Sequence, residues 1–253
     1  MARLATYLIN LDTSHQRLAE ATRQLAAAGI GFGRVPAFDG RGKPDADLPG
    51  YDAKGARALH GRELSGGEIG CYLSHLDCAR RFLASGASYG LVLEDDLAVP
   101  PGAGLLLDQL CDYLDRAEFG AWDLINLGAS SRNHTLPLCD FGNGNPLCRA
   151  YYFPVTTTSL LWSRDGAARF VARGLPIRMP VDHFLRSTLT ESGRGLAFAR
   201  PLLPPRGEAS EIARDGDRSR LRSGWQQLLR KNWRNLRLKL IARRNLSKRL
   251  HQT

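Results

Sequence analysis

The stretch Leu91-Val92-Leu93-Glu94-Asp95-Asp96-Leu97-Ala98-Val99 sets three consecutive carboxylates between apolar triplets. The first triplet is typical of a buried strand. A strand that ends in acids at the carboxyl edge of an α/β sheet places them in the crevice where ligands bind. Hard oxygen donors of this kind suit Mg²⁺ or Mn²⁺. The stretch therefore predicts a cation site for a metal-bound phosphate, the alternative being that the acids cap the strand and face water.

Upstream of these acids, the N-terminus predicts a strand, a helix and a second strand. Residues 6–12 form a short apolar strand that ends in polar residues, Thr13 or Ser14 can cap a helix that closes near Gly29, and residues 32–38 form the next strand. This βαβ order favours a parallel sheet. Polar side chains at the first strand-to-helix junction would then face a nucleotide, or would serve as a helix cap and a surface arginine. They are Asn10, Asp12 and Arg17.

A second helix is predicted from Ser65, which forms a capping box with Glu68, to Gly86. Its first turns contain three glycines, one of them Gly67, which indicate that a ligand or a tightly packed strand approaches the backbone. His75 is expected to lie away from the apolar stripe of this helix. The preceding residues 41–61 lack periodicity and predict a surface loop.

Downstream of the acids, the pattern predicts a helix over 105–114, a buried strand over 123–128, and a helix capped by Ser163. Residues 133–146 predict a mobile cover for an active site. Asp182 and His183 then stand at the start of a strand or helix. They could be a base and a metal ligand, or a cap and its neighbour, and their spacing does not decide between these.

The charge of the chain is concentrated at its end. The 253 residues carry a formal net charge of +10, but residues 218–253 hold twelve Lys or Arg and no acid, which leaves 23 basic against 25 acidic residues before them. We therefore predict a catalytic domain over 1–200, an irregular linker over 201–217 and a basic tail over 218–253.

The tail predicts an amphipathic helix with large apolar side chains on one stripe and cations opposite, which suits an anionic membrane surface. The expected membrane-binding residues are Trp225, Trp233, Arg230, Lys231, Arg234 and Arg237. Docking of the stripe on the body as ordinary core is the alternative. Two other functions fit the tail, nucleic-acid binding with stacked tryptophans and a non-catalytic membrane scaffold, but both leave the three acids without a purpose.

The five cysteines, odd in number and without zinc-type spacing, predict reduced thiols in a cytosol. No run of 18 apolar residues is present, and the N-terminus does not read as a secretory signal. We expect a cytoplasmic protein, peripheral on the inner face of a bacterial cytoplasmic membrane.

Five ordered segments together resemble glycosyltransferase family 25, which includes bacterial lipopolysaccharide galactosyltransferases and animal collagen transferases. The resemblance runs over roughly residues 4–200. Its segments are Tyr7-Leu8-Ile9-Asn10-Leu11-Asp12 with Arg17, Ala37-Phe38-Asp39-Gly40, Gly67-Glu68-Ile69-Gly70-Cys71-Tyr72-Leu73-Ser74-His75, Leu91-Val92-Leu93-Glu94-Asp95-Asp96 and Pro180-Val181-Asp182-His183. The stretch Thr156-Thr157-Thr158-Ser159-Leu160-Leu161-Trp162-Ser163 departs from the usual family pattern, so acceptor contacts there are not carried over.

The resemblance implies a GT-A-like fold with a mainly parallel sheet, a UDP-sugar donor, a divalent cation and inversion at the anomeric carbon. It implies transfer of a hexose, with galactose favoured, to a lipid-linked saccharide of lipopolysaccharide or a related surface glycan, with Mn²⁺ or Mg²⁺ as cofactor. Asp182 is then the expected base, because an inverting enzyme needs a carboxylate near the acceptor hydroxyl. The expected cation ligands are Asp96, Glu94 and His183. The expected donor-binding residues are Asn10, Asp12, Arg17, Gly67, Glu68, His75 and Asp95.

Overall fold

The structure is a computed structural model that describes residues 2–116, 120–131, 133–141, 144–207 and 225–251, with only the backbone described for 225–231. A single sheet of eight strands runs through it in the order β2-β1-β3-β7-β4-β8-β6-β5. The strands are β1 (Leu4–Asn10), β2 (Gly33–Pro36), β3 (Tyr89–Glu94), β4 (Leu124–Asn126), β5 (Thr135–Cys139), β6 (Leu147–Ala150), β7 (Ser159–Ser163) and β8 (Gly195–Phe198).

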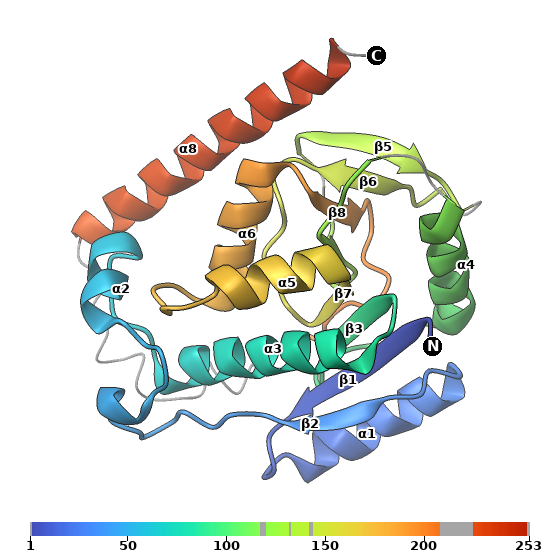
Figure 1. The fold of residues 1–253 in the computed structure, drawn as a ribbon, viewed down its shortest axis with the longest axis horizontal. Helices are drawn as coiled ribbons and strands as arrows, with labels where there is room; N and C mark the ends of the chain where they lie inside the picture. Colours follow the sequence, from blue (N-terminus) through green and yellow to red (C-terminus); the bar gives the residue numbers. More distant parts are fainter. Residues whose placement is uncertain (1, 117–119, 132, 142–143, 208–224, 252–253) are drawn as a thin grey trace.

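Helices cover both faces of this sheet (Figure 1). One face packs against α3 (Gly66–Ser85), α5 (Arg164–Arg173) and α6 (Val181–Ser192), and the other against α1 (His15–Ala27) and α4 (Ala103–Arg116). Alternate residues of a strand serve the two faces, as Leu91 and Leu93 join one core cluster and Val92 the other. This explains why β3 reads as a continuous apolar run.

The expected α/β class with one central sheet is confirmed and agrees with a GT-A-like fold, but the sheet is mixed rather than mainly parallel. Three strand pairings are parallel, β1 with β2, β1 with β3, and β4 with β8. Four are antiparallel, because β7 enters between β3 and β4, and a β5-β6 hairpin closes the far edge.

Two segments predicted as loops contain regular structure. Within residues 41–61 lie a 3₁₀ turn, η1 (Asp45–Asp47), and a helix, α2 (Ala53–Leu59), whose N-cap Asp52 accepts a hydrogen bond from Gly55 N. Within residues 133–146, Thr135–Cys139 form β5 at the sheet edge. The prediction of an active-site cover there is wrong, because these residues pair with β6 instead.

The proposed linker is also corrected over its described part. Leu203 is fully buried, and Ala98 N donates to Pro204 O at 2.7 Å, so residues 201–207 belong to the body. Residues 208–217 lie outside the described residues.

The tail forms a long helix, α8 (Trp225–Leu250), which packs along α6 (Figure 1). Leu238 and Ala242 are buried there, and Asn245 Nδ2 donates to Thr190 O at 3.1 Å. Arg234 and Arg237 also reach the body, at His60 and Glu191, so these two predicted membrane-binding cations contact the protein. The side chains of Trp225, Arg230 and Lys231 lie outside the described part. None of the described helices is long and apolar enough to cross a membrane.

Candidate functional site

Glu94 is the last residue of β3, and Asp95 and Asp96 follow it directly. At this end of the strand the three acids lie beside polar residues from β1 and α1. Ile9 stands opposite Glu94 in the parallel pairing of these strands, which brings Asn10 beside Asp95 just past the strand ends. Asn10 Nδ2 donates to Asp95 Oδ2 at 2.7 Å, and Arg17 of α1 lies 3.4 Å from Asp95 Oδ1. The carboxyl edge of the sheet therefore gathers three of the predicted donor-binding residues, as the crevice rule requires.

Asn10 is itself held by a residue that the sequence did not single out. Arg34 Nε donates to Asn10 Oδ1 at 3.0 Å, and the same guanidinium pairs with Asp12. The Asp12 side chain is 75% exposed, so it lies at the rim of the site. In the structure, Asp12 orients Arg34, and Arg34 in turn fixes the amide of Asn10.

Glu94 is anchored through one of its two carboxylate oxygens. Its Oε1 lies 2.8 Å from His75 Nε2 and accepts a hydrogen bond from Thr157 Oγ1 at 2.7 Å and a longer one from Cys71 Sγ at 3.8 Å. Burial would raise the pKa of Glu94, but the hydrogen bonds from His75, Thr157 and Cys71 outweigh burial and lower it. The carboxylate is therefore ionised at neutral pH, and none of these three contacts uses its second oxygen, Oε2.

Asp96 presents the opposite situation. Its Oδ1 is buried and has no hydrogen-bond partner among the described residues. Burial, together with the charges of Glu94 and Asp95, raises the pKa of Asp96 to about 6, while Arg17 acts in the other direction. An orphaned oxygen whose ionisation is opposed by its neighbours is one that a bound cation would stabilise. Asp96 and Glu94 thus fit the divalent cation expected from the sequence.

The turn that carries Asp96 is braced from behind. Arg206 N donates to Asp96 O at 2.8 Å, and Leu97 forms an isolated bridge with Pro205. Residues 204–206 thereby fix the backbone of the acidic turn, so its carboxylates are positioned before any ligand arrives.

The expected third cation ligand, His183, is not brought to Glu94 and Asp96. His183 lies in the first turn of α6, and its ring centre is 5.4 Å from that of His60. Within the described residues, the group with ligand atoms inside 4.8 Å of one another is Cys71, His75 and Glu94. Burial, followed by the charge of Glu94, raises the pKa of Cys71, so its thiol stays neutral and is a poor ligand.

A pocket opens in front of these groups. Its lining residues are Ile9, Asn10, Leu11, Arg17, Ala37, Phe38, Asp39, Arg41, Gly67, Cys71, Ser74, Glu94, Asp95 and Asp96. His75 lies behind this surface, 1% exposed, because α3 packs on the sheet at that point. Its predicted role as a direct donor contact is thus replaced by a hold on Glu94.

The three glycines at the start of α3 serve two purposes, close packing of the chain and access to the pocket. A Cβ on Gly66 would meet Gly40 O at 1.9 Å, and one on Gly70 would meet Phe38 O at 2.2 Å, so close packing of residues 38–40 explains both. Gly67 lines the pocket. Glu68 completes the capping box with Ser65 and pairs with Arg62 at 2.6 Å, which commits its carboxylate to the protein.

Asp182 lies in the first turn of α6, where its Oδ1 accepts a hydrogen bond from His183 N at 2.7 Å. Its charge acts on the titration of Cys71 at the pocket wall and on three arginines, one from α6 itself and two from other parts of the chain. The arginines are Arg62, Arg186 and Arg234. The predicted base therefore stands between the pocket and a cationic cluster that the sequence did not reveal.

Thr156 and Thr157 form a strained support for Glu94. Thr156 has φ +97°, a backbone region that a β-branched residue rarely adopts. Asn126 Nδ2 donates to Thr156 O at 2.8 Å, and Glu94 N donates to Thr158 O at 2.8 Å. These bonds hold the strained turn so that the Thr157 hydroxyl reaches Glu94. The departure from the family pattern at residues 156–163 was the one sequence signal near this support.

Similarity to known proteins agrees with this geometry. A glycosyltransferase 25 family member from Aedes aegypti is 29% identical over 188 residues, covering 71% of this chain and 30% of the relative. Procollagen galactosyltransferase 1 from Danio rerio is 28% identical over 187 residues, covering 71% and 30%. A human relative, called inactive glycosyltransferase 25 family member 3, is 32% identical over 140 residues, covering 54% and 22%.

This chain thus spans less than a third of the length of these curated relatives. The family model described as glycosyltransferase family 25 (LPS biosynthesis protein) matches residues 4–135, just over half of the chain, and includes every pocket residue described above. The chain belongs to glycosyltransferase family 25.

Proposed function

We propose that this chain is an active, inverting glycosyltransferase that moves a hexose, galactose, from a UDP-sugar to a saccharide acceptor of lipopolysaccharide or a related surface glycan. The observation that carries the proposal is the acidic turn at the pocket floor, where Asp96 keeps a buried oxygen without a partner. A protein that had lost its activity would be free to lose this arrangement, which opposes ionisation of Asp96. Galactose is favoured because the relative from Danio rerio is named procollagen galactosyltransferase 1.

In this proposal the donor nucleotide lies over the ends of β1 and β3. Asn10, Arg17 and Asp95 form a connected set there, in which Arg17 supplies a positive charge toward an anionic ligand. Gly67 leaves room at the pocket wall for the ligand to approach the helix.

The divalent cation, Mn²⁺ or Mg²⁺, would be held by Asp96 and by the Oε2 of Glu94. When bound, such a cation supplies neutralisation of the charge that develops on the leaving diphosphate. His75, Thr157 and Cys71 keep Glu94 ionised and fixed in position by holding its other oxygen. Because the protein holds Oε1, the Glu94 side chain would not have to move for Oε2 to meet the cation.

Asp182 is the proposed general base. The acceptor hydroxyl oxygen forms the new bond to the anomeric carbon, the bond from that carbon to the diphosphate oxygen breaks, and the hydroxyl proton passes to the Asp182 carboxylate. The position of Asp182 supports this role, because its charge acts on Cys71 at the pocket wall.

The outward side of α8 supports attachment to an anionic membrane surface from the cytoplasmic side. Trp233, Leu236 and Leu240 are 71%, 50% and 59% exposed, at the spacing of one helical stripe. Arg243 and Arg244, also exposed, follow on the same side of the helix. An apolar stripe flanked by cations suits the plane of a lipid interface, where a lipid-linked acceptor is displayed.

The direct test is release of UDP from a panel of UDP-sugars, with Mn²⁺ and with a chelator. We expect UDP-galactose to be hydrolysed slowly without an acceptor, only in the presence of the cation, and to raise the Tm together with it. Absence of both UDP release and a Tm shift with every donor would place this chain with the inactive relatives and overturn the proposal.

A further inference from the structure

A second cluster of charged side chains lies beside the pocket, where α2, α6 and α8 meet. Arg234 of α8 contacts His60 after α2, with its NH1 3.3 Å from His60 Nδ1. Burial and the charges of Arg62 and Arg234 lower the pKa of His60 to about 3, so the imidazole is neutral and its ring nitrogen can accept a hydrogen bond from Arg234. Arg234 is therefore turned inward, into the body.

Arg186 reaches the same region from α6. Its Nε donates to Phe153 O at 2.8 Å, and its guanidinium lies 4.8 Å from the centre of the Tyr152 ring. The charge of Arg186 acts on Arg234, and Tyr152 and Asp182 act on both. The two guanidinium groups thus lie close enough to each other and to the proposed base for their charges to interact.

The charge of Asp182 acts on both members of this arginine pair, Arg186 and Arg234, and offsets part of the effect of burial. Burial is the largest effect on each and lowers the pKa of both groups. In the described part of the chain, neither forms an ion pair with a carboxylate, whereas Arg62 nearby is held by Glu68 through both of its terminal nitrogens. Partly desolvated cations that lack a paired anion are costly, and such groups in proteins commonly await an anionic ligand.

We propose that Arg186 and Arg234 form a binding site for an anionic group, a phosphate or a carboxylate, carried by the acceptor. The inference rests on the proposed function, because it says which class of acceptor, an anionic one, the proposed transferase would use. The donor diphosphate is assigned to Asn10, Arg17 and the acidic turn, while the arginine pair lies near Asp182, the proposed base for the acceptor hydroxyl. The planar fork of arginine matches two oxygens of a phosphate or a carboxylate.

One consequence is that α8 belongs to the active site. Trp233 and Arg234 are adjacent in sequence, yet one is exposed on the outer side of the helix and the other contacts His60. A helix that lies on a membrane would in this way deliver an arginine to the acceptor. The anion could be a lipid headgroup phosphate or a phosphate on the saccharide, which share the same chemistry.

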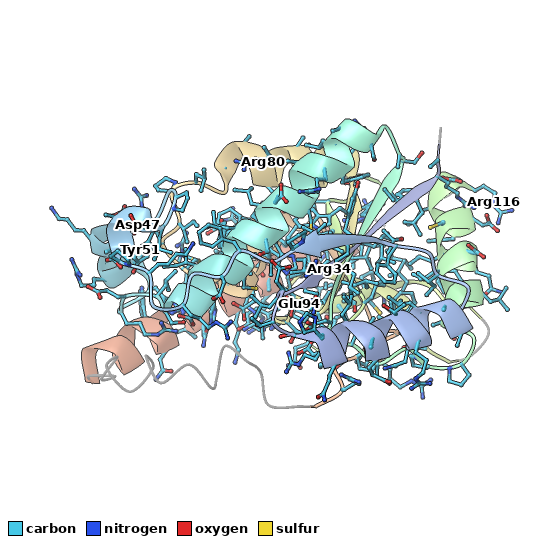
Figure 2. All side chains as sticks on the ribbon, turned by 90° about the horizontal axis from the view of Figure 1, so that it is seen from below. Arg34, Asp47, Tyr51, Arg80, Glu94 and Arg116 are labelled. Atoms are coloured by element: carbon cyan, nitrogen blue, oxygen red, sulfur yellow. The ribbon has the colours of Figure 1, made fainter. Side chains whose placement is uncertain are left out.

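The test is the binding of inorganic phosphate to the full chain by calorimetry, in wild type and in Arg234→Gln, Arg186→Gln and Arg80→Gln. Arg80 is an exposed arginine of α3, away from Glu94 in Figure 2, and controls for the loss of one charge. We expect phosphate to bind the wild type and Arg80→Gln alike, and the Kd to rise about tenfold to a hundredfold in each of the other two variants. Circular dichroism and Tm identify any variant that fails to fold, and Arg234→Lys, which keeps the charge but not the fork, should recover only part of the affinity.

Two further arms identify the source of the anion. Displacement of phosphate by glucose 6-phosphate but not by glucose indicates a saccharide phosphate, and displacement by phosphatidylglycerol vesicles but not by phosphatidylcholine vesicles indicates a headgroup. Equal phosphate affinity in folded Arg234→Gln, Arg186→Gln and Arg80→Gln, or no binding to the wild type at millimolar phosphate, overturns the inference. UDP release without acceptor is measured separately, so failure of the anion site is distinguishable from failure of the proposed transferase.

Discussion

At the scale of single residues, Asp96 makes the cation assignment testable through pH. Its raised pKa means that ionisation costs more in the folded than in the unfolded chain, so folding is penalised progressively as pH rises from about 4 to about 6, and fully above that. Asp96→Asn removes the penalty. Without metal, the variant should have a higher Tm than wild type at pH 8, and the difference should vanish near pH 4.

Addition of Mn²⁺ reverses this order. The cation should raise the Tm of the wild type at pH 8 and lower the apparent pKa of Asp96, while Asp96→Asn should gain little and lose metal-dependent transfer. If Asp96→Asn responds to Mn²⁺ as the wild type does, the cation is held elsewhere and Asp96 is only a strained turn residue.

Asp182 makes a different prediction, because it is assigned to the acceptor side. Asp182→Asn should lower kcat for transfer by about 10²- to 10⁴-fold while the Kd for UDP stays unchanged. Steady-state kinetics of transfer give kcat, and calorimetric titration with UDP in the presence of Mn²⁺ gives the Kd. A loss of UDP affinity in this variant would instead move Asp182 into the cation or nucleotide shell.

Sequence reasoning works well for residues whose partners are local. The capping box of Ser65 and Glu68 spans three residues and is present as predicted, and Gly86 ends α3 in a left-handed conformation. The partners of Glu94 are 19, 23 and 63 residues away and meet only because α3 and the 156–158 turn pack on β3. For the same reason, His75 was predicted to lie off the apolar stripe and is nevertheless buried against a carboxylate.

At the scale of elements, the start of α3 depends on glycine. Gly70→Ala would place a Cβ 2.2 Å from the carbonyl oxygen of Phe38, a backbone atom that cannot move cheaply. We expect this substitution to lower the free energy of unfolding by about 1–3 kcal/mol, as overpacking does. Gly31→Ala, with nothing within 4 Å of the added Cβ, is the matched control and should change stability by less than about 0.5 kcal/mol.

Denaturant unfolding of both variants gives the comparison. Because Phe38 and Gly67 both line the pocket, Gly70→Ala should also weaken UDP binding. Wild-type stability in Gly70→Ala would mean that residues 38–40 can retreat from the helix, and that the glycine is kept for a ligand instead.

The order of the elements along the sheet was beyond sequence reasoning. The βαβ unit of β1, α1 and β2 could be predicted, since each part is adjacent in the chain and has its own periodicity. The antiparallel entry of β7 between β3 and β4 depends on contacts among distant strands, which no local pattern records. The helix α2 was missed because its seven residues are too few to show a period.

At the scale of the whole molecule, the charge pattern predicted a separate linker and tail, whereas in the structure residues 204–206 and α8 pack on the body. The acidic turn is braced by residues 204–206, and α8 buries Leu238 and Ala242 and places Arg234 at His60. Removal of residues 218–253 would therefore expose the surface of α6 and delete part of the proposed acceptor site. Truncation cannot separate membrane attachment from catalysis in this molecule.

Substitution of the outward stripe can separate them. Trp233, Leu236 and Leu240 are exposed, so their replacement by Ser removes apolar surface without opening the core. Full burial of each such side chain in a lipid interface is worth about 1.5–3 kcal/mol, so the triple variant should bind phosphatidylglycerol vesicles at least about 10²-fold more weakly. Its Tm, and its transfer to a soluble acceptor, should match the wild type.

The matched single pair is Leu236→Ser and Leu105→Ser, because Leu105 is 65% exposed on α4, away from α8. Sedimentation with vesicles should fall for Leu236→Ser and stay unchanged for Leu105→Ser. Vesicle binding that survives the triple substitution but disappears in high salt would show that the cations of α8 suffice, as the screening of surface charges predicts. Binding that survives both treatments would mean that another surface of the protein meets the membrane, and α8 would then act only by holding Arg234 at the acceptor site.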